Sequence, residues 1–464
     1  MRAVRLAVEP FEFINYREVS CIRELNQHGT LRITGLVAQD KVQEYQNIAL
    51  KETWVCVKAI SEKGEEQHFF DGVLTGFWMQ QEDQSSVLTI ELKTGSYLLD
   101  FECHTRSFQD SKFRYADVIS ACMMPIGGQF ILLKKKMETI GHMLLQYQET
   151  DWEFLKRVAS YAGIVIIPED ITPGKKLYFG YKIKPVIEEI ITDSFCQKQD
   201  YELYQKKVKS GEKGLHLSDF VSYFVQSREL YGLGETVRFQ GNYFVIGQIK
   251  SWLLGQELYQ EYHLIRKKEG ISAPIFHSKL SGVSLKANVT AVKSTMIQVQ
   301  IEEDENKELA RNCWFDYATV YSTPDGTGWY CMPEVGDQVR LVFPDQKEEH
   351  AYTASSIHMG DNKERKNPDE KSWKNKQKKE ILFTPDAIIL RNNKGLFVEL
   401  SDQKGIRVGS NKDILIQAGG TVRMVSKKAG ISLSAQDTLQ MQQGAAKIRM
   451  KEDISIRGGK IYMN

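Results

Sequence analysis

The chain has 464 residues, 42% of them hydrophobic and 26% charged, so it is long enough for about three domains with real cores. Its 61 basic residues balance 60 acidic ones, which excludes a global electrostatic attraction to nucleic acid or to a membrane surface. The seven cysteines are odd in number, widely scattered and never form a C-x-x-C pair, which argues against a disulfide framework and against a zinc site.

The amino terminus and the cysteine usage together predict where the protein is made. An acidic residue and a proline occur as early as Glu9 and Pro10, too soon for a signal peptide. No window approaches about 18 consecutive apolar residues. We therefore expect a protein made in the cytoplasm with reduced thiols and without a signal peptide. If it acts outside the cell, a route other than general secretion must carry it there.

Residues 1–270 have two β-rich blocks with one clear helix between them. The runs of β-branched and aromatic residues are separated by Gly, Asn, Asp and Ser, as in a barrel or sandwich. These runs lie at residues 31–36, 54–60, 69–77 and 86–92 in the first block, and at residues 234–266 in the second. The arrangement predicts a mainly β hub domain made of two β-barrels.

The clearest local signal predicts a helix over residues 150–162. Thr150 and Glu153 have the spacing of a capping box, and Asp151 is favourable at the positive end of the helix dipole. Gly163 is placed to end the helix in the left-handed conformation. We expect this helix to pack on a barrel and to have no catalytic role. A second, short helix is expected near residues 115–122.

A charged stretch at residues 197–213 gives a weaker signal. Its cluster of Lys206, Lys207 and Lys209 is typical of a solvated loop, and we predict one here.

Residues 280–360 change to a compact all-β pattern. The candidate strands lie at residues 283–292, 297–301, 310–319, 328–332 and 338–343. Five short strands in so few residues are typical of an OB-fold barrel. This segment has no basic stripe with interleaved aromatic residues, and its longest charge run, Glu302 to Glu305, is acidic. We therefore expect a structural role for this barrel and no nucleic-acid partner.

Residues 361–380 contain eight basic and five acidic residues, with almost no apolar residue besides Trp373. This composition predicts an exposed charged linker.

Residues 381–464 contain a pair of alternating apolar residues about every eight positions. A pattern of this period indicates stacked short strands, each with two apolar side chains on one face. We predict that these side chains form the core of a β-helical needle: Ile406, Val408, Ile414, Ile416, Val422, Met424, Ile431, Leu433, Leu439, Met441, Ile448, Met450, Ile454 and Ile456.

One chain or three chains could build this needle. A single-chain solenoid with three faces would have only about three coils, which is near the lower limit for a stable array. Three intertwined chains would stack about ten strand levels into a rod roughly 50 Å long. The periodicity alone leaves both open.

An enzyme is not expected, because the chain has no G-x-S-x-G, H-E-x-x-H or Walker A motif. We also expect no cofactor and no metal, and no histidine or cysteine follows His358 to build a metal-bound tip. The competing function is a polysaccharide- or receptor-binding protein with a solenoid foot, with or without activity on carbohydrates. That function would require aromatic and carboxylate residues along one outer face of the repeats, where Arg, Gln, Lys and Ser prevail.

Several separate stretches resemble the VgrG-type spike proteins of type VI secretion and the baseplate hub-and-spike proteins of contractile phage tails and phage-tail-like bacteriocins. The order of the domains is also similar to that of the family. The stretches that carry the resemblance are Arg106-Ser-Phe-Gln-Asp110 with Asp117-Val-Ile119, residues 147–163, Gly232-Leu-Gly-Glu-Thr-Val237, residues 329–339, and Ile406-Arg-Val-Gly409.

The resemblance implies a homotrimer whose hub is a pseudo-sixfold ring on the inner tube of a contractile machine, in contact with baseplate proteins. The OB-folds and an intertwined trimeric needle would point at the target membrane. Effectors would be carried as cargo, and the assembled particle would act outside the cell. Some relatives carry an enzyme between the OB-fold and the needle or after the needle, and we expect neither here.

The apolar end of the rod predicts a further partner. An open stack of strands that ends in apolar groups invites another chain to add to it. We expect Ile461, Tyr462 and Met463 to bind a separate tip protein of the PAAR-like class that the resemblance implies.

Overall fold

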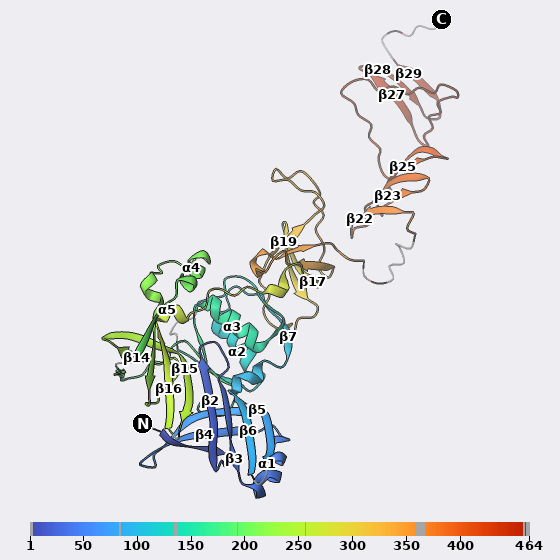
Figure 1. The fold of residues 1–464 in the computed structure, drawn as a ribbon. Helices are drawn as coiled ribbons and strands as arrows, with labels where there is room; N and C mark the ends of the chain where they lie inside the picture. Colours follow the sequence, from blue (N-terminus) through green and yellow to red (C-terminus); the bar gives the residue numbers. More distant parts are fainter. Residues whose placement is uncertain are drawn as a thin grey trace. The chain divides into compact units, whose positions relative to one another are not determined.

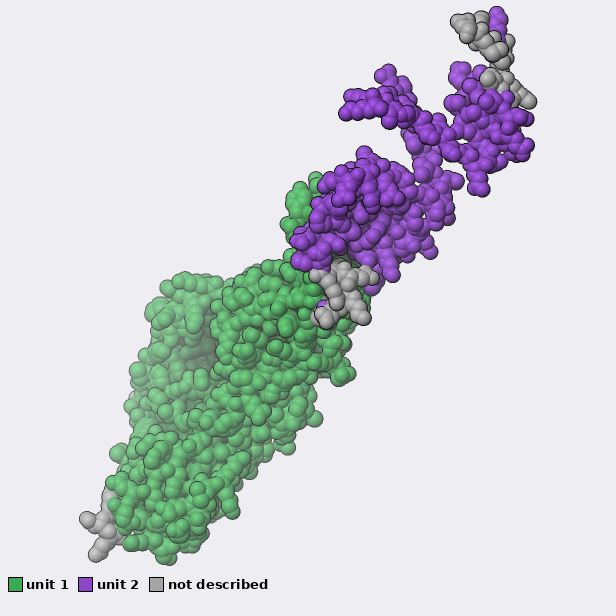
Figure 2. All heavy atoms as spheres, turned by 90° about the vertical axis from the view of Figure 1, so that its right-hand side faces the viewer, with its two compact units in different colours: residues 1–359 green, residues 360–464 purple. Residues whose placement is uncertain are grey.

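The protein is described here as a computed structural model with two compact units, residues 1–359 and residues 360–464, which Figure 2 colours separately. The described residues are 3–82, 85–133, 138–192, 194–255, 257–358, 360, 367–457 and 460. Both units are mainly β, as the sequence predicts. Among the described residues, no helix is long and apolar enough to cross a membrane.

The first unit contains a large antiparallel sheet that joins both β-rich blocks (Figure 1). Its strands, in spatial order, are β1 (Ala3–Glu9), β4 (Trp54–Ser61), β5 (Glu66–Glu82), β6 (Ser85–Lys93), β3 (Thr30–Val37), β2 (Asn15–Glu24), β15 (Asn242–Leu254), β16 (Glu257–Ile265), β13 (Val221–Ser227) and β12 (Phe195–Gln199), with β14 (Thr236–Phe239) beside β15. The blocks meet where β2 pairs with β15. Each block nevertheless has its own hydrophobic core.

Alternation of side chains explains why these segments form strands. In β3, Leu31 and Ile33 are buried, whereas Arg32 between them is exposed. Because successive side chains of a strand point to opposite faces, such a segment covers a core with one face and meets solvent with the other.

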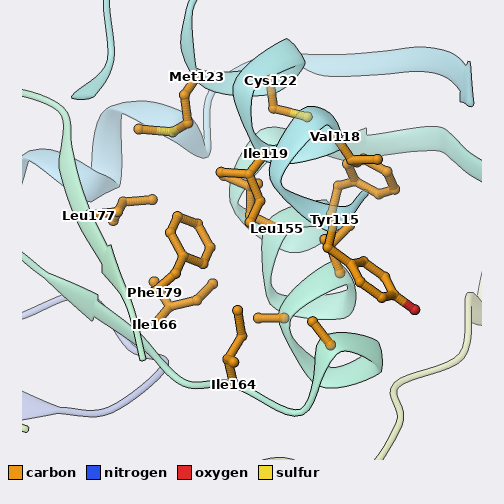
Figure 3. Close-up of a cluster of buried hydrophobic side chains, with 14 of the residues drawn as sticks. Tyr115, Val118, Ile119, Cys122, Met123, Leu155, Ile164, Ile166, Leu177 and Phe179 are labelled. Carbon is orange, nitrogen blue, oxygen red and sulfur yellow. The ribbon is translucent and has the colours of Figure 1, made fainter. Parts of the chain in front are cut away.

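Two helices and several short strands form a third core in this unit, shown in Figure 3. The elements are β7 (Cys103–Phe108), α2 (Tyr115–Met123), β8 (Gln129–Leu132), β9 (Leu144–Thr150), α3 (Asp151–Ala162), β10 (Ile166–Pro168) and β11 (Lys176–Phe179). Val118 and Ile119 of α2 lie close to Leu155 of α3 in this core, with Phe179 of β11 beside them.

The structure confirms the predicted capping of helix α3. The Glu153 amide donates to Thr150 Oγ1 at 3.1 Å, and the Thr150 amide donates to Glu153 Oε2 at 3.2 Å. Gly163 ends the helix with a φ of 61°. Both predicted features therefore have the contacts that their sequence spacing requires.

The loop predicted at residues 197–213 is wrong, because β12 and helix α4 (Tyr201–Lys209) occupy most of this range. Lys207 is fully buried, and its ammonium group donates to the carbonyl oxygens of Lys268 and Ile271. A charged residue can be buried when its donors are satisfied in this way.

The remaining helices, all short, are α1 (Val42–Ala49), α5 (Lys267–Gly270), η1 (Gln39–Lys41), η2 (Gly95–Leu99), η3 (Leu217–Phe220), η4 (Ser278–Leu280) and η5 (Glu348–His350).

The OB-fold segment forms a closed barrel. Its strands are β17 (Ser284–Lys293), β18 (Met296–Ile301), β19 (Phe315–Ala318), β20 (Gln338–Val342) and β21 (Tyr352–Ala354). The strand predicted at residues 328–332 is wrong, and β21 completes the barrel instead by pairing with both β19 and β20. A segment with high strand propensity forms a strand only where neighbouring strands pair with it. Residues 329 and 330 are exposed aromatic residues that lie outside the barrel sheet.

The second unit contains two antiparallel meanders. The first comprises β22 (Lys371–Lys374), β23 (Glu380–Thr384), β24 (Ala387–Arg391), β25 (Phe397–Ser401) and β26 (Gly405–Gly409), and the second comprises β27 (Leu439–Gln443), β28 (Ala446–Met450) and β29 (Ile454–Arg457). Residues 410–438 form no strand, so the three predicted strands in this range are absent. Gly419, Gly420 and Gly430 interrupt the range and weaken strand formation, because glycine has no side chain to pack.

Candidate functional site

The apolar pairs of the second unit lie directly opposite one another across its strands. In the first meander, Leu390 faces Val398, and Val398 in turn faces Val408. Leu400 faces Ile406 in the same way. Directly opposed residues of an antiparallel sheet point to the same face. The pairs therefore form one continuous apolar row on one face of the meander.

The second meander continues the same pattern. Leu439 pairs with Met450, and Met441 pairs with Ile448. Met450 pairs in turn with Ile454 of β29. We call the apolar residues of both meanders the needle row.

Much of the needle row is exposed within this chain. Ile406, for example, is 75% exposed. The predicted core residues that are exposed are Ile406, Val408, Ile414, Ile416, Val422, Met424, Ile431, Leu433, Met441 and Ile454, whereas Leu439, Ile448 and Met450 are partly buried. The side chain of Ile456 and the tip residues Ile461, Tyr462 and Met463 lie outside what the structure describes. Exposed apolar surface of this extent marks an interaction site.

A groove with a volume of about 650 Å³ follows the first meander. Its lining is mainly apolar, with Leu390, Val398, Val408 and Ile414 among the residues, and it also includes the charged residues Lys379, Glu380, Arg391 and Asp413. Arg391 Nε donates to Glu380 Oε2 at 2.8 Å, so this charge has a partner inside the unit. The apolar lining is therefore available for another apolar surface.

A second candidate site is the joint between the hub and the OB barrel. The acidic run that follows β18 accepts hydrogen bonds from β7 of the hub. Asp304 Oδ1 accepts from the Ser107 amide at 2.8 Å, and Glu305 Oε1 accepts from the Thr105 amide at 2.9 Å. Glu305 Oε2 also accepts from Arg106 Nε at 3.1 Å. The acidic run therefore links the two domains through hydrogen bonds. The sequence did not predict this contact.

A buried arginine forms the centre of this joint. Arg157 of α3 is 1% exposed, and its Nη2 donates to Glu149 Oε2 at 2.8 Å and to the Leu145 carbonyl at 2.6 Å. Its Nη1 donates to Glu348 of η5, in the OB segment. Burial lowers the pKa of Arg157, but the charges of Glu348 and Glu149 outweigh it, so the net pKa is raised. The guanidinium therefore stays charged between its two carboxylates.

Apolar contacts complete the joint. Met143 and Leu145, which lie in or beside β9 of the hub, are buried in the same core as Leu285 and Leu341 of the barrel. The hub strand thus supplies part of the barrel core. The stretches at Arg106 to Asp110 and at residues 147–163, which carry the family resemblance, lie at this joint.

Glu305 makes the joint sensitive to acid. Burial raises the pKa of its carboxyl, but hydrogen bonds from Thr105 and His104 and the charge of Arg106 outweigh burial and bring the net pKa below the usual 4.5. A carboxyl with a lowered folded-state pKa stabilises the fold above about pH 4.5 and loses that stabilisation as the pH falls through the folded value.

We therefore expect Glu305→Gln to lower the thermal unfolding midpoint of the first unit at pH 7 and to lower it by less at pH 3, because the stabilisation is lost progressively as the pH falls below 4.5. Thermal scans at both pH values test this expectation. Glu303→Gln is the control, because it removes a charge from the same run. An equal loss at both pH values would contradict a role for the ionised carboxylate.

The structure also brings together three potential metal ligands that the sequence did not suggest. Cys56 of β4 lies beside His68 and Asp71 of β5, with one ligand atom from each residue and all three atoms within 4.8 Å of one another. The chain spacing of these residues has no recognised motif, because a pairing between strands creates the cluster.

Two protein-family models match the chain, in the same order as its domains. The phage tail baseplate hub (GPD) model matches residues 23–184. The model of the type VI secretion system/phage-baseplate injector OB domain matches residues 285–358. Together they match about half of the chain and include both sides of the joint. A search of curated proteins finds no match.

Solved structures of similar fold come from the same machines. The E. coli c3393 protein, a type VI secretion component similar to the T4 bacteriophage tail proteins gp27 and gp5, is 13% identical with a TM-score of 0.52 over 76% of this chain and 100% of that one. The half-lidded Francisella PdpA-VgrG complex includes a chain that is 7% identical with a TM-score of 0.55, over 88% of each chain. At these identities the likeness shows the fold. With the two family models, it places this chain in the family of VgrG-type spike and contractile-tail baseplate hub-and-spike proteins.

Proposed function

We propose that this chain is the central spike and hub of a contractile injection machine, and that it works as a homotrimer. The hub would cap the inner tube, and the needle would puncture the target envelope. The needle row is the main support for this proposal. Its residues lie directly opposite one another on neighbouring strands, yet most of them are exposed in a single chain. Three chains that share one axis would bury it.

The strand pairing favours three chains over a single-chain solenoid. A three-faced solenoid would stack each strand on one a full coil later, whereas consecutive strands pair here in antiparallel meanders. Leu382 is the one strongly buried hydrophobic residue among the described residues of the second unit. A monomer would therefore leave this unit almost without a core.

A shared axis also explains how a needle could resist axial load. If the apolar side chains of three chains fill one core, unwinding one chain exposes the cores of all three. Because each level contacts only its neighbours, resistance is distributed along the rod. Geometry, more than any one bond, would make the needle stiff.

The proposed partners differ between the hub and the needle. The hub would bind the inner tube protein and the baseplate proteins. The tip at Ile461 to Met463 would bind a PAAR-like protein, and effectors would be carried as cargo. The Francisella VgrG, which is in complex with PdpA, supports the idea that a spike of this fold holds another protein. The assembled particle would be delivered outside the cell and contact the target membrane transiently.

We propose no catalytic activity for this chain. Most exposed residues of the needle row are aliphatic and methionine side chains, with Trp373 and Phe383 as the exposed aromatics of the described meanders, whereas binding or cleavage of a polysaccharide would use several aromatic rings and paired carboxylates. This composition favours a structural spike over the polysaccharide-binding alternative.

Light scattering tests the proposed trimer. The full chain should elute with a mass of about 160 kDa, three times its 53.2 kDa. Truncation after residue 360 should leave the first unit folded, because it is a separate compact unit, but with weakened trimerisation. A monomeric full chain would contradict the proposal. A truncated chain that stayed as trimeric and as heat-stable as the full chain would show that the needle is not the core of assembly.

A further inference from the structure

Three side chains of different chemistry converge on one face of the hub sheet. Cys56 Sγ lies 3.7 Å from His68 Nδ1, and the same Nδ1 lies 3.2 Å from Asp71 Oδ2. Thiolate, imidazole and carboxylate are the three ligand types that zinc prefers in proteins.

An irregularity in β5 creates this convergence. Residues three apart in a regular strand point to opposite faces, so His68 and Asp71 would not meet. Here the pairing register shifts between Val57 and Lys58, so that Lys58 faces His68 while Cys56 faces Asp71. Phe69 and Phe70 both turn into the core. The extra residue places His68 and Asp71 on the face that carries Cys56, as β-bulges do beside functional sites.

Without a metal, hydrogen bonds can satisfy this cluster in one arrangement, in which the Asp71 carboxylate accepts from both His68 Nδ1 and the Cys56 thiol. If Nδ1 carries a proton, it can donate to Asp71 but cannot accept from the thiol of Cys56. If Nδ1 is unprotonated, it can accept from the thiol, but its lone pair then faces the Asp71 carboxylate. A cation at the centre would also satisfy all three atoms at once.

The surroundings of Asp71 also favour a cation. Its side chain is 5% exposed. Glu169, which interacts electrostatically with Asp71, is also buried, and its Oε2 has no hydrogen-bond partner among the described residues. A bound cation would compensate the charge of these two buried carboxylates.

The geometry excludes a catalytic triad of these residues. A triad needs the nucleophile and the acid on opposite nitrogens of the imidazole, whereas Cys56 and Asp71 share Nδ1. Burial and the charge of Asp71 raise the pKa of the Cys56 thiol to about 11, which leaves it a poor nucleophile. A coordinated metal deprotonates such a thiol.

We propose that Cys56, His68 and Asp71 bind one zinc ion, with water in the fourth position. Zinc–ligand bonds of about 2.3 Å to sulfur and about 2.0 to 2.1 Å to nitrogen or oxygen give tetrahedral edges of about 3.6 Å (S to N) and about 3.4 Å (N to O). The observed 3.7 and 3.2 Å are close to these edges. The ion would cross-link β4 to the irregular part of β5, near edge strand β1. This site departs from the expectation that the chain holds no metal.

Cobalt binding tests the site without any activity assay. The full chain, freed of metal and of any histidine tag, should bind one Co²⁺ with the charge-transfer band of a thiolate ligand, and Zn²⁺ should abolish the band. Cys56→Ser should lose the band, and His68→Ala should weaken binding by at least about 100-fold. The controls Cys103→Ser and His350→Ala should match the wild type, since both positions are exposed and lie outside the cluster.

The wild-type chain provides a test that does not depend on the folding of a variant. Zn²⁺ should slow the alkylation of Cys56 and leave that of Cys103 unchanged, as measured by mass spectrometry of tryptic peptides. Equal alkylation of Cys56 with and without Zn²⁺ would overturn the proposal. A Co²⁺ thiolate band that persists in Cys56→Ser, or the absence of such a band in the wild type, would overturn it as well.

Discussion

Met441→Asp should convert the proposed trimer into single chains, whereas Gln440→Asp should leave it intact. Met441 belongs to the needle row opposite Ile448, while Gln440 is its exposed neighbour in β27. Successive strand residues point to opposite faces, so only the first substitution would place a charge at the shared axis. Each unpaired buried carboxylate costs about 3–5 kcal/mol, and three of them would meet in one trimer.

Light scattering distinguishes the outcomes, with about 160 kDa expected for Gln440→Asp and about 53 kDa for Met441→Asp, on the basis of the chain mass of 53.2 kDa. The two variants differ by one position and introduce the same residue, so a general effect of charge on β27 would affect both. If both remained trimeric, the row would not be the shared core. If both dissociated, the substitution would act on the strand and not on the axis.

Local sequence patterns predicted the structure wherever near neighbours in the chain decide it. The capping contacts of Thr150 and Glu153 lie within one turn of helix, and they form as their spacing requires. The alternation of apolar residues predicted several strands of the second unit for the same reason. In residues 410–438 this rule failed, because two apolar side chains do not make a strand without a paired neighbour.

Long-range pairing set the limit of what could be predicted. Tyr352–Ala354 is a strand because β19 and β20 lie on either side of it, which its three residues cannot indicate. In the sequence Glu305 is only one residue of an acidic run, yet its partner Thr105 lies 200 residues earlier in the chain. The convergence of Cys56 with His68 depends on a single irregularity in β5. No local pattern contains these contacts.

Arg157→Met should destabilise the first unit by about 3–5 kcal/mol, because it leaves the carboxylates of Glu149 and Glu348 buried without their common partner. The matched control is Arg32→Met. Its salt bridge to Glu91 is 2.6 Å long but about half exposed, so we expect a cost of less than about 1 kcal/mol. Urea midpoints of the full chain, followed by near-UV circular dichroism, compare the two. Equal shifts would contradict a special role for the buried arginine.

A double-mutant cycle separates the charge pair from the packing of the long side chain. Glu348→Leu should cost stability in the wild type, where it removes one of the two carboxylates that hold Arg157, and should cost less or even stabilise in Arg157→Met, where that carboxylate has no partner. Additive effects would mean that the arginine acts through its aliphatic stem. Since Glu348 lies in the OB segment and Arg157 in helix α3 of the hub, a positive coupling would also mean that this one ion pair links the stability of the two domains. In the proposed spike, an OB barrel coupled to the hub in this way would transmit axial load together with the hub.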